Sequence, residues 1–435
     1  MASNSKFLAE LLDSNGDVNT ANLDNLSSTL GTASTNNTGD FLQVANNLSD
    51  LNDAATARTN LGLGTAATNN TGDFLQPNDL PPAILSVTGN IFDQFPSDIS
   101  VSLYNPTSTV SVKYLKDGVV LVTETNISVT NGTISLTTPS IVYNLVYDTI
   151  IELEVVNSTG LPSSNRVSKI IQRSPTGGTI YTSGNYRYHK FISSGTFATY
   201  TAQWSVDYLI VAGGGGGGRY IGGGGGAGGL IQDSTTVSEN SSISILVGAG
   251  GAAHQGTNAT DSSFGTIATA IRGGYGGGAS GQLLDGQSGG SGGGGGGSGG
   301  SSSGAGGAGT NGQGYSGANG HNTSINSRGG GGGGAGESGL LSDGGDGLDY
   351  STWATATSSG NNGYYAGGGG GGAYLNSSYT STGGAGGGGD SAYSGSAGQS
   401  NTGGGGGGGG GGATANEGSG GNGGSGIVII RYQIT

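Results

Sequence analysis

Short runs of alternating apolar and polar residues fill the segment that follows Pro81 and Pro82. Such alternation turns one side of each run toward a core and the other toward water, which is typical of half-buried β-strands. The dipeptides Asp117-Gly118 and Asn131-Gly132 separate neighbouring runs and favour tight hairpins. The expected strands are ILSVTG (84–89), DISVSLY (98–104), VSVKYL (110–115), VVLVTE (119–124), ISVT (127–130), TISLT (133–137), IIELEVV (150–156) and NRVSKIIQ (165–172). We therefore expect an antiparallel β-sandwich over residues 81–175.

The size and strand spacing of this segment fit an Ig-like module. It contains neither cysteine nor tryptophan, so the buried tryptophan and disulfide of antibody domains are absent and the similarity is one of architecture. A module of this kind could grip a sugar. The pattern favours a rigid spacer.

Two strongly apolar runs, VDYLIVA (206–212) and IVIIRY (427–432), bracket a region that holds most of the chain's 100 glycines. The glycines form tracts of similar length, separated by loops rich in Tyr, Ser, Asn and Thr. The tracts are 213–218, 222–229, 273–278, 289–300, 329–334, 367–372, 383–389 and 403–412. A flexible Gly/Ser coil is the simplest interpretation of this composition. The bracketing strands and the lack of proline after Pro175 favour instead an ordered domain over residues 176–435.

The ordered alternative is a bundle of polyglycine II helices. Each tract would be a left-handed helix with three residues per turn and no internal hydrogen bonds. Its N–H and C=O groups must then pair with neighbouring tracts, and only glycine lacks the Cβ that would hold the backbones apart. We expect the occasional Ala and Ser on outer faces. The predicted fold class is mainly β: a fibrous N-terminal connector, an Ig-like β-sandwich, and a β-base that carries the polyglycine II bundle.

Charged residues make up 9% of the chain, the net charge is −14, and every lysine precedes Phe191. This distribution argues against nucleic acid or anionic lipid as a partner. The chain has no cysteine, which excludes disulfides and thiolate metal sites. No apolar run approaches the length of a membrane-spanning helix, and residues 1–18 lack the pattern of a signal peptide. We expect synthesis in the cytoplasm and no membrane insertion.

Residues 1–80 carry a near-exact repeat, since GTASTNNTGDFLQ (31–43) recurs as GTAATNNTGDFLQ (64–76). Each copy has few apolar residues, so Phe41 and Phe74 are expected to bury against other copies or other chains. The intervening NLSDLNDAATARTNLGLG (47–64) resembles the shaft and connector segments of bacteriophage tail fibres. The resemblance implies that the N-terminus joins phage tail or baseplate proteins and that the chain forms a homotrimer.

A second resemblance covers about residues 178–435. YRYHKFISSGTF (186–197), VDYLIVAGGGGGG (206–218), SSFG (262–265) and GGSGIVIIRY (423–432) resemble the glycine-rich domain at the end of many phage tail fibres. In related adhesins the glycine tracts form a polyglycine II bundle whose loops bind the host receptor. The resemblance therefore implies a virion protein that recognises a bacterial surface receptor, either a glycan or an outer-membrane protein.

If successive tracts alternate in direction, their loops fall at two opposite ends of the bundle. Loops 219–221, 279–288, 335–366 and 390–402 are expected far from the bracketing strands, and loops 301–328, 373–382 and 413–417 are expected near them. The count does not close, because the tract 418–426 then points the wrong way. Aromatic and apolar residues among small polar ones are typical of antibody paratopes and of binding hot spots. The candidate receptor-binding residues are Tyr220, Leu283, Leu284, Asp349, Tyr350, Trp353, Tyr364, Tyr365 and Tyr393. The alternative is that these rings pack on the glycine bundle, which has no side chains of its own.

No catalytic, metal or cofactor site follows from the sequence. Glu337, Asp343, Asp346 and Asp349 could supply oxygen ligands for Ca²⁺ or meet a basic receptor group, but a solvated acidic loop is the simpler interpretation. A glycosidase needs two carboxylates on rigid elements, and the glycine tracts lack the GK[ST] ending of a phosphate loop. We expect a non-enzymatic receptor-binding protein. The alternatives are a purely structural virion fibre or head appendage, and an ice-binding protein.

Overall fold

The computed structural model describes residues 80–434, apart from 254–258, 279–282, 299–301, 323–326, 375–379 and 413–416. The chain divides into two compact units, Met1–Pro77 and Asn78–Thr435, and every described residue belongs to the second. The repeat of residues 31–76, and with it the predicted N-terminal connector, lies outside the described residues. Strands predominate and the helices are short, which confirms the predicted mainly β class for the described part of the chain.

The segment after Pro82 forms two sheets that share one core. The first sheet has the order β1–β3–β6, and the second has the order β2–β8–β7–β4–β5. Their elements are β1 (Ala83–Thr88), β2 (Ile91–Phe92), β3 (Asp98–Tyr104), β4 (Thr109–Lys116), β5 (Val119–Ser128), β6 (Thr133–Thr137), α4 (Ser140–Tyr143), β7 (Ile150–Asn157) and β8 (Val167–Gln172). Alternate apolar residues from both sheets, among them Val101, Val112 and Leu153, are fully buried in that core. The alternation in the sequence therefore corresponds to one buried and one solvated face of each sheet.

Both predicted tight turns are present. Asp117 and Gly118 have φ of 51° and 77°, and Asn131 and Gly132 have φ of 50° and 72°, as a type I′ turn requires. The two strands expected over 119–130 are instead largely one strand, β5, with a shift in its register against β4. Asn126, with φ of 59°, lies at this irregularity. Because Asn tolerates the left-handed region, β5 continues on both sides of the bulge.

The two apolar runs that bracket the glycines pair with each other. Strand β12 (Trp204–Val211) is antiparallel to β19 (Ile427–Gln433), with Val211 opposite Ile427. They lie within a sheet of order β13–β12–β19–β10–β9, completed by β13 (Leu230–Val237), β10 (Tyr186–Phe191) and β9 (Thr179–Ser183). A second sheet consists of β11 (Gly195–Ala198), β14 (Ser242–Leu246), β15 (Ser262–Phe264) and β16 (Ala268–Ala270). The two sheets share a core to which Phe197, Tyr208 and Phe264 belong. We call these two sheets together with their core the β base.

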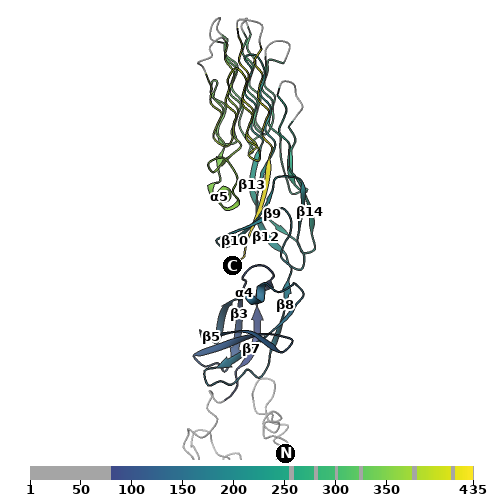
Figure 1. Cartoon of the computed structure of the whole chain (residues 1–435), viewed down its shortest axis with the longest axis vertical. Helices are drawn as coiled ribbons and strands as arrows, with labels where there is room; N and C mark the ends of the chain where they lie inside the picture. The colour runs from purple at the N-terminus through teal and green to yellow at the C-terminus, as the bar shows by residue number, and fades with distance from the viewer. Residues whose placement is uncertain are drawn as a thin grey trace, which may run out of the picture. The chain divides into compact units, whose positions relative to one another are not determined.

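Between these strands the glycine tracts run side by side (Figure 1) and are joined by backbone hydrogen bonds. The tract 222–229 is fully buried, and its N–H groups donate in turn to three neighbouring tracts. Gly222, Gly225 and Gly228 donate to Gly409, Gly406 and Gly403; Gly223 and Gly226 donate to Gly277 and Gly274; Gly224 and Ala227 donate to Gly330 and Gly333. Every third residue thus bonds to the same neighbour.

A side chain has no room at these positions. A Cβ atom added to Gly224 would overlap the carbonyl oxygen of Gly369, and one added to Gly225 would overlap that of Gly215. The expectation that Ala and Ser lie on outer faces is wrong for Ala227 and Ser291, which are both 0% exposed. Ala227 belongs to an apolar cluster at the β base that includes Leu209 and Tyr365, so its methyl group lies among side chains.

Other tracts have few consecutive glycines but keep glycine pairs three residues apart. The pairs are Gly286 and Gly289, Gly304 and Gly307, Gly317 and Gly320, and Gly395 and Gly398. Added Cβ atoms on Gly304 and Gly317 would overlap the carbonyls of Leu284 and Gly293, so these glycines face neighbouring backbones. A count of consecutive glycines misses such tracts. The predicted alternation of loop ends fails for this reason.

The segment 335–366 consequently lies at the β base, which corrects the prediction that it is at the opposite end. It forms β17 (Leu348–Asp349), α5 (Ser351–Thr357) and β18 (Tyr364–Tyr365), and Figure 1 shows α5 beside the sheet. The ring of Trp353 meets that of Tyr188 edge-on with centroids 5.9 Å apart, and the Lys190 ammonium donates to the Thr357 carbonyl at 2.7 Å.

Candidate functional site

We call the end of the bundle away from the β base the distal end. Backbone hydrogen bonds connect the described residues that flank several of the loops between tracts. The N–H of Gly297 donates to Ile221 (2.8 Å), that of Tyr374 donates to Ser327 (2.9 Å), and that of Tyr220 donates to Gly418 (3.1 Å). Described segments that are far apart in sequence are thus neighbours at the distal end.

The turn 219–221 has an unusual backbone. Tyr220 and Ile221 both have positive φ, 48° and 55°, a region that β-branched residues rarely adopt. Ile221 is 0% exposed and lies next to Gly297 and Gly411, where the absence of a Cβ leaves space for its side chain. The buried isoleucine therefore anchors the turn, and Arg219 and Tyr220, which precede it, are partly exposed.

An aromatic pair and an ion pair lie beside this turn. The rings of Tyr220 and Tyr374 are nearly perpendicular, at 84° with centroids 6.4 Å apart. The guanidinium of Arg219 lies 3.5 Å from the carboxylate of Glu417. Burial raises the pKa of Tyr220, with smaller contributions from Tyr374 and Glu417, so its hydroxyl is a neutral hydrogen-bonding group. This part of the distal end therefore combines two aromatic rings with one positively and one negatively charged hydrogen-bonding side chain.

Four of the predicted binding residues lie at or near the distal end: Tyr220, Leu283, Leu284 and Tyr393. Tyr393 is 53% exposed and Leu283 is 63% exposed. The carbonyl groups of Leu283 and Leu284 accept hydrogen bonds from Gly278 (2.9 Å) and Gly296 (2.7 Å), which ties this loop to the neighbouring tracts. A receptor contact through these residues stays a prediction.

The remaining predicted residues, Asp349, Tyr350, Trp353, Tyr364 and Tyr365, lie at the β base. Trp353 is 5% exposed and Tyr365 is 0% exposed, with the Tyr365 hydroxyl 2.6 Å from that of Ser359. Tyr350 packs against the same apolar cluster, and burial raises its pKa. The Asp349 carboxylate accepts a hydrogen bond from the Ser351 N–H at 2.7 Å. Asp349 lies opposite Tyr364 in the two-stranded β17–β18 sheet. Trp353 and Tyr365 are thus buried, but Trp353 packs on strand side chains of the β base such as Tyr188, not on the glycine tracts as the alternative stated above has it.

Sequence reasoning missed Tyr374 and Glu417, because loops 373–382 and 413–417 were expected at the β base. The described flanks of both loops lie at the distal end, where Tyr374 forms a parallel bridge with Gly411. The signal that could have found them is the three-residue spacing of glycine, which marks the additional tracts.

The acidic residues considered as metal ligands have another role. The carboxylates of Asp343 and Asp346 accept hydrogen bonds from the backbone N–H groups of Thr382 (2.8 Å) and Ala385 (2.7 Å). Asp285 accepts in the same way from Ala305 at 2.8 Å. Such carboxylates bond to backbone donors at the perimeter of the bundle. Within the described ranges, no group of three or more histidine and acidic residues could hold a metal ion.

None of the helices in the described part of the chain is long and apolar enough to cross a membrane.

Comparison with known proteins adds one positive finding. A family model described as a glycine-rich domain matches residues 192–433, which is more than half of the chain. No curated protein matches the chain. The matched segment begins just after β10, ends with β19 and includes the glycine bundle. The chain therefore belongs to the family defined by this glycine-rich domain.

Proposed function

We propose that the chain is a bacteriophage tail fibre protein that attaches the virion to a host cell through the distal end of its glycine bundle, without enzymatic activity. The observation that supports this most directly is that described segments from distant tracts are neighbours at the distal end and carry tyrosines there. The target would be a bacterial surface receptor, either a glycan or an outer-membrane protein.

In this proposal the tracts are polyglycine II helices. Donation to the same neighbour at every third residue is the pattern expected of a helix with three residues per turn. The lack of room for a Cβ in the inner tracts supports the same assignment. A rigid bundle holds the loop ends in place, so less conformational entropy is lost when a receptor binds.

The other parts of the chain would hold this surface away from the virion. The two-sheet module of residues 81–175 would be an Ig-like spacer, and residues 1–80 would join phage tail or baseplate proteins. The fibre would be a homotrimer, as the resemblance to tail fibre connectors implies.

Tyr393, Tyr220 and Tyr374 are the proposed anchors on the distal end. Tyr393 is 53% exposed, and Tyr220 and Tyr374 are held edge to face. Tyrosine supplies a large contact area at a low entropy cost, and its hydroxyl adds a hydrogen bond. Arg219 and Glu417 would make the surface selective by orienting charged or polar groups of the receptor.

Binding of fluorescently labelled full-length protein to a panel of bacteria tests the proposal. We expect the triple variant Tyr220→Ser/Tyr374→Ser/Tyr393→Ser to lose binding that the unchanged protein shows. Tyr315→Ser is the matched control, because Tyr315 is 52% exposed and its N–H bonds to Gly334 near the β base. Equal binding by all three proteins would contradict a receptor site at the distal end.

If folded protein binds no host, a purely structural fibre becomes the better explanation. The ice-binding alternative has a separate test, the shape of ice crystals grown in the presence of the protein. Unaltered growth would remove it.

A further inference from the structure

Five Asn-Gly pairs in the described part of the chain contain the groups for a reaction that needs no enzyme. In such a pair the glycine nitrogen can attack the amide carbon of the asparagine side chain, because glycine has no Cβ that would shield its nitrogen. The structure holds the five pairs in two different ways. They are 131–132, 311–312, 319–320, 362–363 and 422–423.

The pair 319–320 is bonded to a neighbouring tract through both of its reacting groups. The side-chain oxygen of Asn319 accepts a hydrogen bond from the Gly306 N–H at 2.9 Å. The Gly320 N–H, which carries the attacking nitrogen, donates to the Gly304 carbonyl at 2.9 Å. Gly320 is also buried, and a Cβ added to it would overlap the Gly296 carbonyl, so the surrounding backbone leaves it little room to rotate.

The pair 422–423 repeats this arrangement on another side of the bundle. The side-chain oxygen of Asn422 accepts from the Ala253 N–H at 2.8 Å, and the Gly423 N–H donates to the Gly251 carbonyl at 2.8 Å. In both pairs the neighbouring tract supplies a donor and an acceptor that are two residues apart. Both asparagines are exposed to water, so it is this bonding that distinguishes them from the other three.

The other three pairs lie in turns outside the tracts. Their asparagine side chains are exposed, and the N–H groups of their glycines donate to no acceptor among the described residues. The pair 131–132 forms the tight turn between β5 and β6, and 362–363 forms the turn before β18. Gly312 is itself exposed, and no atom lies within 4 Å of a Cβ added to it. Asn311 therefore has the greatest freedom to react.

We propose that Asn131, Asn311 and Asn362 are sites of spontaneous deamidation, with Asn311 the fastest, and that the bundle protects Asn319 and Asn422. The glycine nitrogen forms a bond to the amide carbon, the bond from that carbon to the amide nitrogen breaks, and the glycine proton leaves with it as ammonia. Water then opens the succinimide ring at either carbonyl and gives aspartate or isoaspartate. This chemistry is independent of the proposed attachment at the distal end.

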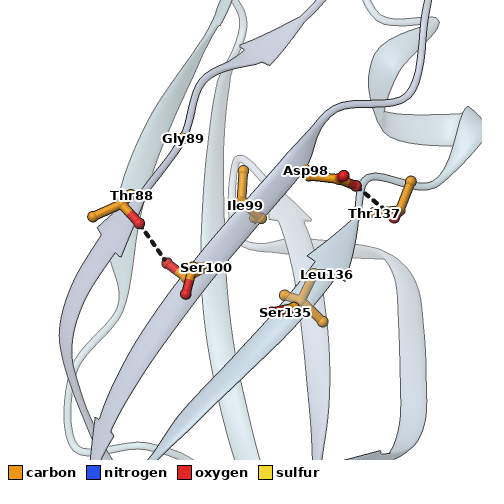
Figure 2. A pocket seen from close by; sticks show the side chains of 8 residues that line it. All are labelled: Thr88, Gly89, Asp98, Ile99, Ser100, Ser135, Leu136 and Thr137. Carbon is orange, nitrogen blue, oxygen red and sulfur yellow. Dashed lines mark hydrogen bonds between the residues drawn. The ribbon is translucent and has the colours of Figure 1, made fainter. Parts of the chain in front are cut away.

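Deamidation at Asn131 would reach the outer face of the β1–β3–β6 sheet. The Gly132 carbonyl accepts from the Leu103 N–H of β3 at 2.7 Å, and β6 begins directly after this turn. Further along β6 the Thr137 hydroxyl donates to the Asp98 carboxylate at 2.7 Å, beside the hollow in Figure 2. Isoaspartate places its Cβ in the main chain, so it would disturb the register of β6 against β3.

Peptide mapping of native and denatured protein tests the proposal. Full-length protein is kept in mildly alkaline buffer with and without guanidinium chloride, and samples taken over time are cut with chymotrypsin and weighed by mass spectrometry. Cleavage at Tyr315 separates Asn311 from Asn319. In guanidinium chloride the five pairs should react at similar rates. In native protein Asn319 and Asn422 should react at least about tenfold more slowly than Asn311, because the bundle must first open locally.

The variant Ala253→Pro tests the bonding of Asn422 directly. Proline lacks the N–H that donates to Asn422, and its fixed φ suits a polyglycine II backbone. Asn422 should then react at least about threefold faster, because one hydrogen bond that holds it is lost. Ala253→Ser keeps the N–H and is the matched control. A slow reaction at Asn319 in the same molecule shows that the rest of the bundle is folded.

Three results would overturn the proposal. They are native rates at Asn319 and Asn422 that equal their denatured rates, a native Asn311 that reacts no faster than Asn319, and a rate at Asn422 that is the same in Ala253→Pro and Ala253→Ser.

Discussion

The two-sheet module and the glycine bundle bury their backbones in opposite ways. In the module each strand pairs within the plane of a sheet, and side chains such as Val101, Val112 and Leu153 fill the core. In the bundle the tract 222–229 bonds to neighbours in several directions, and the space that side chains would occupy is taken by other backbones. The module is stabilised by side chains that fill its core, whereas the bundle is stable only where side chains are absent.

This comparison has a direct consequence for mutations. Removing methyl groups should weaken the module, and adding one should weaken the bundle. Two substitutions test this consequence directly, and two further predictions concern His189 in the β base and Asp346 at the perimeter of the bundle. They follow from the largest expected effect to the smallest.

Gly224→Ala should destabilise most, by about 4 kcal/mol or more, since the new Cβ would overlap the Gly369 carbonyl and backbone cannot move aside as a side chain can. Gly312→Ala is the control, because no atom lies within 4 Å of its added Cβ. Its φ of 74° still costs about 1 kcal/mol for alanine. Urea unfolding of the full chain measures both. Similar losses in the two variants would mean that the tracts are not tightly packed.

Leu153→Ala should cost about 3 kcal/mol in the two-sheet module, because it leaves a cavity in a core where Leu153 is 0% exposed. Leu85→Ala makes the same change at a side chain that is 66% exposed and should have little effect. Scanning calorimetry should show a lower transition temperature for the first variant only. Equal shifts would show that the module is not held by this core.

His189 should make the β base sensitive to acid. Burial lowers its pKa from 6.5 to about 4, and its ring bonds to the Gly177 carbonyl at 2.7 Å. The unfolded chain therefore binds a proton at a higher pH than the folded chain does. The folded state has its full stability above pH 6.5 and loses about 2–3 kcal/mol as the pH falls toward 4.

Melting temperatures of the unchanged protein, His189→Gln and His321→Gln between pH 7 and pH 4 test this prediction. The loss should shrink in His189→Gln and persist in His321→Gln, because His321 is exposed. Identical pH profiles in all three would contradict it.

Asp346→Ala should have the smallest effect, about 1 kcal/mol or less, because water can replace an exposed acceptor. The loss should nevertheless be local. Hydrogen exchange at the Ala385 amide, which donates to Asp346, should accelerate, whereas Glu239→Ala, an exposed acidic residue in a turn, should leave it unchanged. Unchanged protection of Ala385 in both variants would mean that the carboxylate does not complete the bonding of that tract.

Much of the β structure could be predicted from local pattern. Alternation identified strands such as 98–104 and 133–137, and Asp117-Gly118 could be read as a turn because only a few residue types adopt two successive positive φ angles. The apolar runs 206–212 and 427–432 were predicted as strands, whereas their pairing as β12 and β19 was not predicted and is seen only in the structure. The continuity of β5 through Asn126 could not be read locally, because its pairing with β4 determines it.

The candidate site was predicted only in part. Tyr220 lies in the turn that follows the first tract, so its place at the distal end needed no count of tracts. Tyr374 and Trp353 were assigned to the wrong ends of the bundle, because a count of consecutive glycines misses some tracts. These outer tracts keep glycine where it faces another backbone and carry side chains elsewhere. Which positions face another backbone depends on the neighbours of each tract.

By itself the sequence determined the strands, the turns and the places where a side chain is absent, since these depend on residues close together along the chain. Only the tertiary structure decided which tracts are neighbours, which loops share the distal end, and which rings are buried at the β base. The physical reason is that successive N–H groups of a glycine tract point in different directions around its axis. The tract carries no side chain that would specify which neighbouring tract accepts their hydrogen bonds.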